Sequence, residues 1–187
     1  MSRDIYAGFA ESWSVAHSVM DSAYPHSRGV ILAVDDEEED VELMRLLFRK
    51  AGVTQPIEVY RSGEELVAAL TRTMDGNGAI AADLPLLCFL DVKMPNMNGH
   101  ELLRWIRARP QLDQISVVML SSSEHPADVK EAARNGAQCY LAKYPQPTVL
   151  KQVMTEAERM VAQNPSKEWF GLPANLLLRW GLNKERN

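Results

Sequence analysis

This 187-residue chain contains little cysteine, no excess of basic residues and no long apolar run. Its two cysteines, Cys88 and Cys139, lie inside apolar runs, which is typical of small buried hydrophobic side chains in a reducing compartment. The net charge of −5 argues against a nonspecific nucleic-acid binder, which usually carries a basic face. No stretch approaches the roughly 18 apolar residues of a membrane helix, and a secretory signal pattern is missing. We therefore expect a cytoplasmic protein with neither nucleic acid nor membrane as a partner.

The composition is that of a globular protein, with 46% hydrophobic and 24% charged residues. The length allows one domain with a substantial core and some additional chain. We expect an N-terminal arm over residues 1–28, a domain over residues 29–163 that ends at Asn164-Pro165, and an aromatic and apolar C-terminal extension over residues 164–187. Two alternatives stay open for the extension: it folds back onto its own domain, or it forms a surface for a partner.

From Gly29 onward, apolar strand-like runs alternate with segments of helical periodicity, which predicts βαβ units. Ser62 and Glu65 have the spacing of a capping box, and Asn98-Gly99 opens a helix that Pro110 ends. The expected fold is α/β: a doubly wound, five-stranded parallel sheet of flavodoxin-like order 2-1-3-4-5 with helices on both faces. The expected strands cover residues 30–34, 57–60, 86–90, 117–120 and 138–142. The other expected helices cover residues 40–50, 126–135 and 148–163.

Carboxylates follow two of the expected strands at the point where each strand stops. Asp35 and Asp36 come directly after the run that begins at Gly29, and Asp91 comes directly after residues 86–90. The carboxyl ends of parallel strands meet at one edge of the sheet, where sites in such folds are built. Three close negative charges need a cation, and Mg²⁺ prefers oxygen ligands. The sequence therefore predicts a magnesium site at this edge.

Two further polar residues follow strands at the same edge, Ser121 after the fourth and Lys143 after the fifth. With them the chain resembles the receiver domains of bacterial two-component response regulators over residues 29–163. The resemblance rests on the spacing from Asp91 to Ser121 and Lys143, and on these matching segments: Val34-Asp-Asp36, Leu90-Asp91-Val-Lys-Met-Pro95, Asn98-Gly99, Leu120-Ser121 and Tyr140-Leu-Ala-Lys143.

The resemblance implies that Asp91 is the phosphoacceptor. It also implies that Asp36 and Asp91 bind Mg²⁺ together with the backbone carbonyl of Lys93, and that Asp35 acts mostly through a bound water. Phosphoryl transfer depends mainly on positioning and on charge stabilisation, and these residue types can supply both.

The remaining roles also follow from the resemblance. Lys143 and Ser121 are expected to contact phosphoryl oxygens. Tyr140 is expected to be an aromatic switch that follows the movement of Ser121. Pro95 and Gly99 are expected to shape the loop after Asp91. Taken singly, each residue has a structural alternative, such as an N-cap for Ser121 or a surface position for Lys143.

One departure from the family pattern concerns the proline that usually follows the lysine. Here Tyr144 stands between Lys143 and Pro145. A cis peptide bond between Lys143 and Tyr144 is disfavoured, because a cis bond without proline costs roughly 3 kcal/mol or more. A cis bond between Tyr144 and Pro145 stays open as an alternative.

The expected function is that of a stand-alone response regulator, not an enzyme, that signals through protein contacts. Its expected partner is a sensor histidine kinase, with a bacteriophytochrome as the candidate. A homodimer is a further candidate, through the residue 126–163 face or the C-terminal extension. One alternative is a receiver-like module that binds without phosphorylation. The other, an aspartyl-phosphate phosphatase, is disfavoured because such enzymes commonly carry an acid where Lys93 stands.

Overall fold

The computed structural model describes residues 29–74, 85–123 and 125–163. The expected arm, most of the loop before residue 85 and the C-terminal extension lie outside the described residues. In chain order the elements are β1 (Ile31–Val34), α2 (Glu38–Lys50), β2 (Ile57–Tyr60), α3 (Gly63–Thr73), β3 (Leu87–Asp91), α4 (Gly99–Arg107), the short 3₁₀ helix η1 (Pro110–Leu112), β4 (Ser116–Ser121), α5 (Pro126–Arg134), β5 (Cys139–Ala142) and α6 (Pro147–Gln163).

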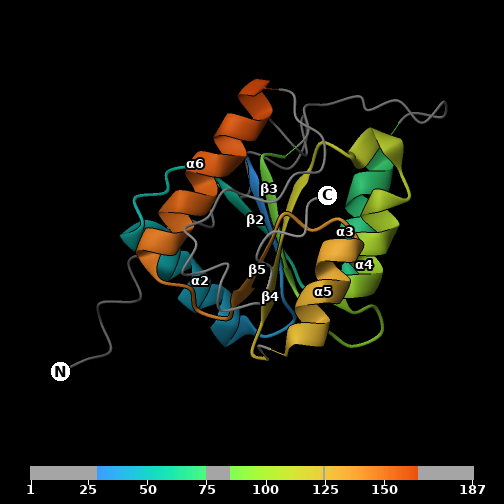
Figure 1. Ribbon diagram of the computed structural model, residues 1–187, viewed down its shortest axis with the longest axis horizontal. Helices are drawn as coiled ribbons and strands as arrows, with labels where there is room; N and C mark the ends of the chain where they lie inside the picture. Colours follow the sequence, from blue (N-terminus) through green and yellow to red (C-terminus); the bar gives the residue numbers. More distant parts are fainter. Residues whose placement is uncertain (1–28, 75–84, 124, 164–187) are drawn as a thin grey trace.

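The predicted fold is confirmed. The five strands form one parallel sheet in the order β2-β1-β3-β4-β5. Helices α2 and α6 cover one face, and α3, α4 and α5 cover the other (Figure 1). Each face has its own apolar core, one around Leu102 and Met119 and the other around Phe48 and Phe89. Among the described helices, none has the length and apolar character needed to cross a membrane.

Local side-chain contacts explain where two of the helices begin. The Ser62 hydroxyl accepts a hydrogen bond from Glu65 N at 3.1 Å, as the capping signal predicts. The Glu65 carboxylate accepts from Arg61 N, one residue before the cap. Asn98 and Glu101 form a complete capping box at the start of α4. This cap fixes the helix that follows the Asp91 loop.

Several predicted boundaries differ from the structure by one or two residues. Helix α2 begins at Glu38 rather than at Asp40, because acidic residues in a first turn interact favourably with the helix dipole. Asp91 and Ser121 are the last residues of their strands, not the first residues after them. The backbones of both residues are therefore part of the sheet, which fixes where their side chains begin.

The alternative of a cis bond before Pro145 is wrong, because the described residues contain no cis peptide bond. The chain turns after β5 through Tyr144 itself, whose backbone lies in the left-handed region at φ 62°. That region is uncommon for a residue with a bulky side chain.

Candidate functional site

The predicted carboxylates converge at the carboxyl edge of the sheet. Asp35 follows β1, and Asp91 ends the neighbouring strand β3. One carboxylate oxygen each from Asp35, Asp36 and Asp91 lies within 4.8 Å of the others. Asp35 and Asp91 are buried, and Asp36 is half-buried. The edge therefore gathers three acidic side chains in one small volume, as the sequence predicts.

Lys143 supplies the positive charge that this cluster needs. Its ammonium nitrogen lies 3.1 Å from Asp35 Oδ2 and 3.2 Å from Asp91 Oδ1. It also pairs with Asp40 Oδ2, from the first turn of α2. Lys143 follows β5, and its backbone N–H donates to Ser121 O at 2.7 Å, which fixes the start of the loop. The lysine therefore links the carboxyl ends of β1 and β3 with α2.

Burial and mutual charge shift the acid–base properties of the cluster. Burial raises the pKa of Asp91 to about 6, against the opposing effect of the Lys143 charge. Burial also raises the pKa of Asp35, although the hydrogen bond from Lys143 opposes it. For Lys143 burial acts to lower the pKa, but the hydrogen bonds to Asp40 and Asp35 outweigh it and raise the pKa. The site thus favours a charged lysine facing carboxylates that are hard to ionise together.

The donor set fits a hard divalent cation. Asp36 Oδ1 is buried and has no hydrogen-bond partner among the described residues. A buried carboxylate oxygen without a donor is costly, and a metal ion beside it would remove that cost. All three side chains of the cluster offer oxygen, the ligand type that Mg²⁺ and Mn²⁺ accept. The cluster is thus able to hold a divalent cation.

Ser121 and Tyr140 lie on neighbouring strands and meet the same loop residue. Ser121 Oγ accepts a hydrogen bond from Ser123 N at 3.0 Å. The Tyr140 hydroxyl donates to Ser123 O at 3.1 Å, with its ring buried in the core. The contacts place both predicted switch residues against the backbone of one residue, Ser123, in the loop that follows β4. Their roles in switching stay predictions.

The loop after Asp91 is fixed by Gly99. Gly99 N donates to Val92 O at 3.2 Å, and a Cβ at this position would lie 2.2 Å from Asp91 O. The start of α4 can approach the Asp91 backbone this closely only because glycine lacks a side chain. The Lys93 side chain is exposed, and the role of its carbonyl as a metal ligand stays a prediction.

Sequence reasoning missed Asp40 and Tyr144. The sequence marks residue 40 only as the start of an expected helix, and Tyr144 only as the residue between Lys143 and Pro145. In the structure Asp40 accepts from Lys143 and, at 2.7 Å, from the Tyr144 hydroxyl. Asp40 lies in the first turn of α2, a few residues after the end of β1, and this closeness to the site in the sequence is the signal that could have identified it.

The response regulator receiver domain model matches residues 31–155, more than half of the chain. The probable methanogenesis regulatory protein FilR2 of Methanothrix harundinacea is 33% identical over 114 residues, which is 61% of this chain and 71% of that protein. The response regulator Rcp1 of Synechocystis sp. is 29% identical over 61% of this chain and 76% of its own length.

Solved structures of response regulators also align with this chain. The phosphorylated cyanobacterial phytochrome response regulator RcpA aligns with a TM-score of 0.55 at 26% identity, covering 75% of this chain and 97% of that one. The Mn²⁺-bound form of the response regulator Rcp1 aligns with a TM-score of 0.54 at 26% identity, covering 78% and 99%. The chain belongs to the response regulator receiver domain family, whose members are phosphoacceptor modules of two-component signalling rather than classical enzymes.

Proposed function

We propose that this protein accepts a phosphoryl group on Asp91 from a sensor histidine kinase, in a reaction that requires Mg²⁺, and passes the signal on through protein contacts. The observation that supports this most directly is the placement of buried Asp91 within reach of both a lysine and two further carboxylates. A lone carboxylate is a weak nucleophile towards an anionic phosphoryl group. It becomes effective when it is aligned and when nearby cations offset the phosphoryl charge.

In the proposed transfer, an Asp91 carboxylate oxygen forms a bond to phosphorus while the bond from phosphorus to the kinase histidine nitrogen breaks. That nitrogen keeps the electron pair. Asp36, Asp91 and the Lys93 carbonyl would hold Mg²⁺, with Asp35 acting through a water. When bound, the ion supplies positive charge beside the phosphoryl oxygens. Lys143, already 3.2 Å from Asp91 Oδ1, would pair with one of those oxygens.

Ser121 gives a route from the phosphoryl group to the surface. Its hydroxyl would turn from the Ser123 N–H towards a phosphoryl oxygen, and the loop that also accepts the Tyr140 hydroxyl would move with it. Such a change is a shift between two existing conformations. Moving the ratio from 1:99 to 99:1 needs about 5.5 kcal/mol, which charge-assisted contacts at Lys143 and the metal are of a size to supply.

The test is intact-protein mass after treatment with acetyl phosphate, with Mg²⁺ or with chelator. We expect the wild-type protein to gain one phosphoryl group only when Mg²⁺ is present. Asp91→Asn should gain none, whereas Asp128→Asn on α5 should behave as wild type. Absence of any gain in the folded wild-type protein would contradict phosphoryl acceptance and favour the binding module that works without phosphorylation.

We further propose that the kinase is of the bacteriophytochrome type. Support comes from the likeness to RcpA, which is described as a phytochrome response regulator. The test is phosphotransfer from purified autophosphorylated kinases to this protein. We expect a bacteriophytochrome kinase to transfer faster than a kinase with an unrelated sensor. Equal rates would remove the argument for this partner.

We also propose that the protein acts as a stand-alone regulator in the cytoplasm, with residues 29–163 as its receiver. RcpA supports this, because almost its whole chain aligns with this one. A homodimer through α5, β5 and α6, or through residues 164–187, is the proposed assembly. Sedimentation of the full chain and of a chain ending at residue 163 distinguishes the two surfaces. A monomer in both states of phosphorylation would contradict the dimer.

A further inference from the structure

Asp40 is shared between Lys143 and Tyr144. Its Oδ2 accepts from the Lys143 ammonium group and its Oδ1 accepts from the Tyr144 hydroxyl at 2.7 Å. The carboxylate is mostly buried, with 16% of the Asp40 side chain exposed. Lys143 and Tyr144 follow each other in the loop after β5, while Asp40 belongs to α2. One side chain therefore ties this loop to the helix.

The contacts of Lys143 leave its ammonium group no spare donor. A lysine has three N–H donors, and Asp35, Asp40 and Asp91 each lie within ion-pair distance. A phosphoryl oxygen can therefore bind Lys143 only if one of these contacts is given up. Phosphorylation alters Asp91 itself, and Asp35 belongs to the carboxylate cluster that fits a cation. Asp40 lies outside that cluster, so it keeps competing for the lysine.

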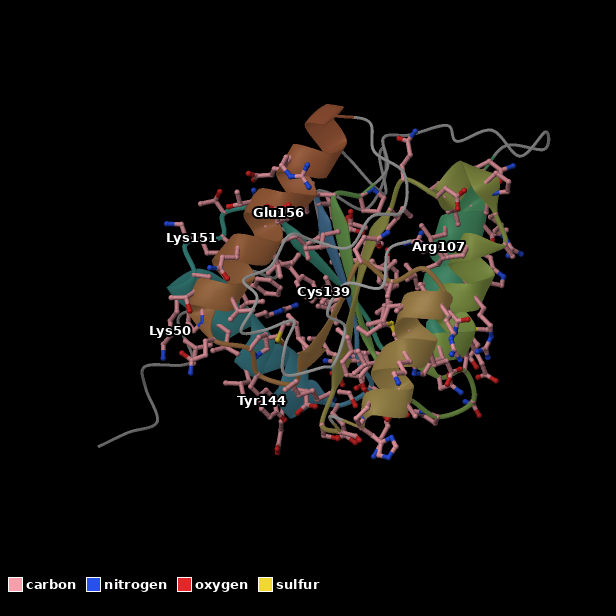
Figure 2. The ribbon with its side chains drawn as sticks, in the orientation of Figure 1. Lys50, Arg107, Cys139, Tyr144, Lys151 and Glu156 are labelled. Atoms are coloured by element: carbon pink, nitrogen blue, oxygen red, sulfur yellow. The ribbon has the colours of Figure 1, made fainter. Side chains whose placement is uncertain are left out.

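Tyr144 follows Lys143 directly and is exposed, so it connects the contacts of Lys143 with the protein surface. The residue is 48% exposed, and it lies at the end of the domain where the loop meets α2 (Figure 2). Its backbone is in the left-handed region, which a tyrosine adopts only when its surroundings hold it there. The hydroxyl bond to Asp40 is one such constraint. Loss of that bond would allow the loop to relax.

We propose that Asp40 is a positioning residue that holds Lys143 and Tyr144 in the resting state, and that phosphorylation of Asp91 draws Lys143 away from Asp40. The adjoining Tyr144 moves with Lys143, which breaks its separate bond to Asp40 Oδ1. This inference rests on the proposed function of Asp91. Contacts made only in the resting state oppose the active one, so removing them increases the affinity for a phosphoryl group. The coupling is reciprocal: whatever binds at Asp91 changes the state of Tyr144 by the same factor.

The first test measures the affinity of the full chain for beryllium fluoride, an analogue of the phosphoryl group, in the presence of Mg²⁺. Tyr144→Phe removes the hydroxyl bond without changing charge, and we expect it to bind about twofold to tenfold tighter. Asp40→Asn should gain more than Tyr144→Phe, because it also weakens a charged contact. Glu39→Gln makes the same charge change one residue earlier, on an exposed side chain, and should bind as the wild type does.

The second test places 3-fluorotyrosine at position 144 and follows its ¹⁹F resonance. We expect Mg²⁺ with beryllium fluoride to move the wild-type resonance to a new position. In Asp40→Asn the resonance should already lie near that position before the analogue is added. A merely structural role for Asp40 would lower the melting temperature without producing this coupling.

The two tests separate this inference from the proposed function. If neither beryllium fluoride nor acetyl phosphate acts on Asp91, the proposed function fails and this inference fails with it. If Asp91 is modified but the Tyr144 resonance stays in place, the positioning role alone is overturned. It is likewise overturned if Tyr144→Phe and Glu39→Gln both bind the analogue with wild-type affinity. Tyr144→Phe keeps the test decisive if Asp40→Asn does not fold.

Discussion

A Cβ at Gly99 would lie 2.2 Å from the backbone carbonyl oxygen of Asp91, so the first residue of α4 packs directly on the strand end that carries the candidate phosphoacceptor. No real side chain carbon approaches a backbone oxygen so closely. Because the contact is with backbone rather than with the end of a flexible side chain, it cannot be relieved by a rotamer change. The close contact between Gly99 and the Asp91 backbone thus fixes the start of α4 relative to Asp91.

Gly99→Ala is expected to displace α4 from Asp91. The free energy of unfolding should fall by about 1–3 kcal/mol, the usual cost of overpacking, as measured by urea denaturation. Phosphorylation by acetyl phosphate should slow as well, because the Asp91 carbonyl and carboxylate move together. Gly63→Ala is the comparison, since its Cβ would meet only the Met97 side chain, which can shift. Equal losses in the two variants would contradict the argument from backbone contact.

Lys143→Met is expected to destabilise the metal-free protein at neutral pH by roughly 3 kcal/mol, because three carboxylates lose their common counter-charge. Mg²⁺ should restore more stability to this variant than it adds to the wild type, since the ion can take over part of that role. Urea denaturation with chelator and with Mg²⁺ measures both effects.

The control for that variant is Lys151→Met, an exposed lysine on α6, which should change the free energy of unfolding by less than about 0.5 kcal/mol. If Mg²⁺ stabilised Lys143→Met and the wild type equally, lysine and cation would not share the same carboxylates.

The strand ends could be predicted from the sequence because two independent signals agree there. Continuous apolar runs mark buried parallel strands, and a polar residue at the end of each run falls on one edge of the sheet. Asp35, Asp91 and Lys143 follow this rule, and the structure brings them together. Burial of the sheet on both faces leaves little freedom in where these side chains lie.

The contacts of Asp40 and Arg107 could not be predicted in the same way, because they depend on how helices pack on the sheet. Arg107 donates to Gly136 O at 2.9 Å, to Ile115 O at 2.8 Å and to Gln138 Oε1 at 2.9 Å. In the sequence it is one of many charged residues on a helix. Only the approach of the end of α4 to the segments that precede β4 and β5 gives it these acceptors.

Arg107→Lys is therefore expected to lower the free energy of unfolding by about 2–3 kcal/mol. A lysine cannot reproduce the planar array of donors, and it would leave buried carbonyl oxygens without partners. Arg134→Lys, at an exposed position on α5, should be nearly neutral. Phosphorylation of Asp91 should persist in the folded fraction of Arg107→Lys, because the bonds of Arg107 lie outside the carboxylate cluster. Loss of phosphorylation in fully folded protein would contradict a purely structural role.

The stability of the metal-free protein should fall as the pH rises through the titration of Asp91. Burial raises the pKa of this carboxyl to about 6 in the folded protein, against 3.8 as its ordinary value. Between these two values the folded state binds more protons than the unfolded state, so the free energy of unfolding decreases with increasing pH. The stability associated with the protonated Asp91 carboxyl is fully present below about pH 4, and roughly 2–3 kcal/mol of it is lost by pH 7.

Asp91→Asn isolates this contribution, because it leaves the other carboxylates in place. In the presence of chelator, the free energy of unfolding of the variant should increase relative to that of the wild type as the pH rises from 4 to 7. Saturating Mg²⁺ should remove the trend, since a bound cation favours the ionised carboxylate and protons must compete with it. A difference that is constant across this range would show that folding does not raise the pKa of Asp91, and that Lys143 and the backbone N–H of Lys93 together offset its burial.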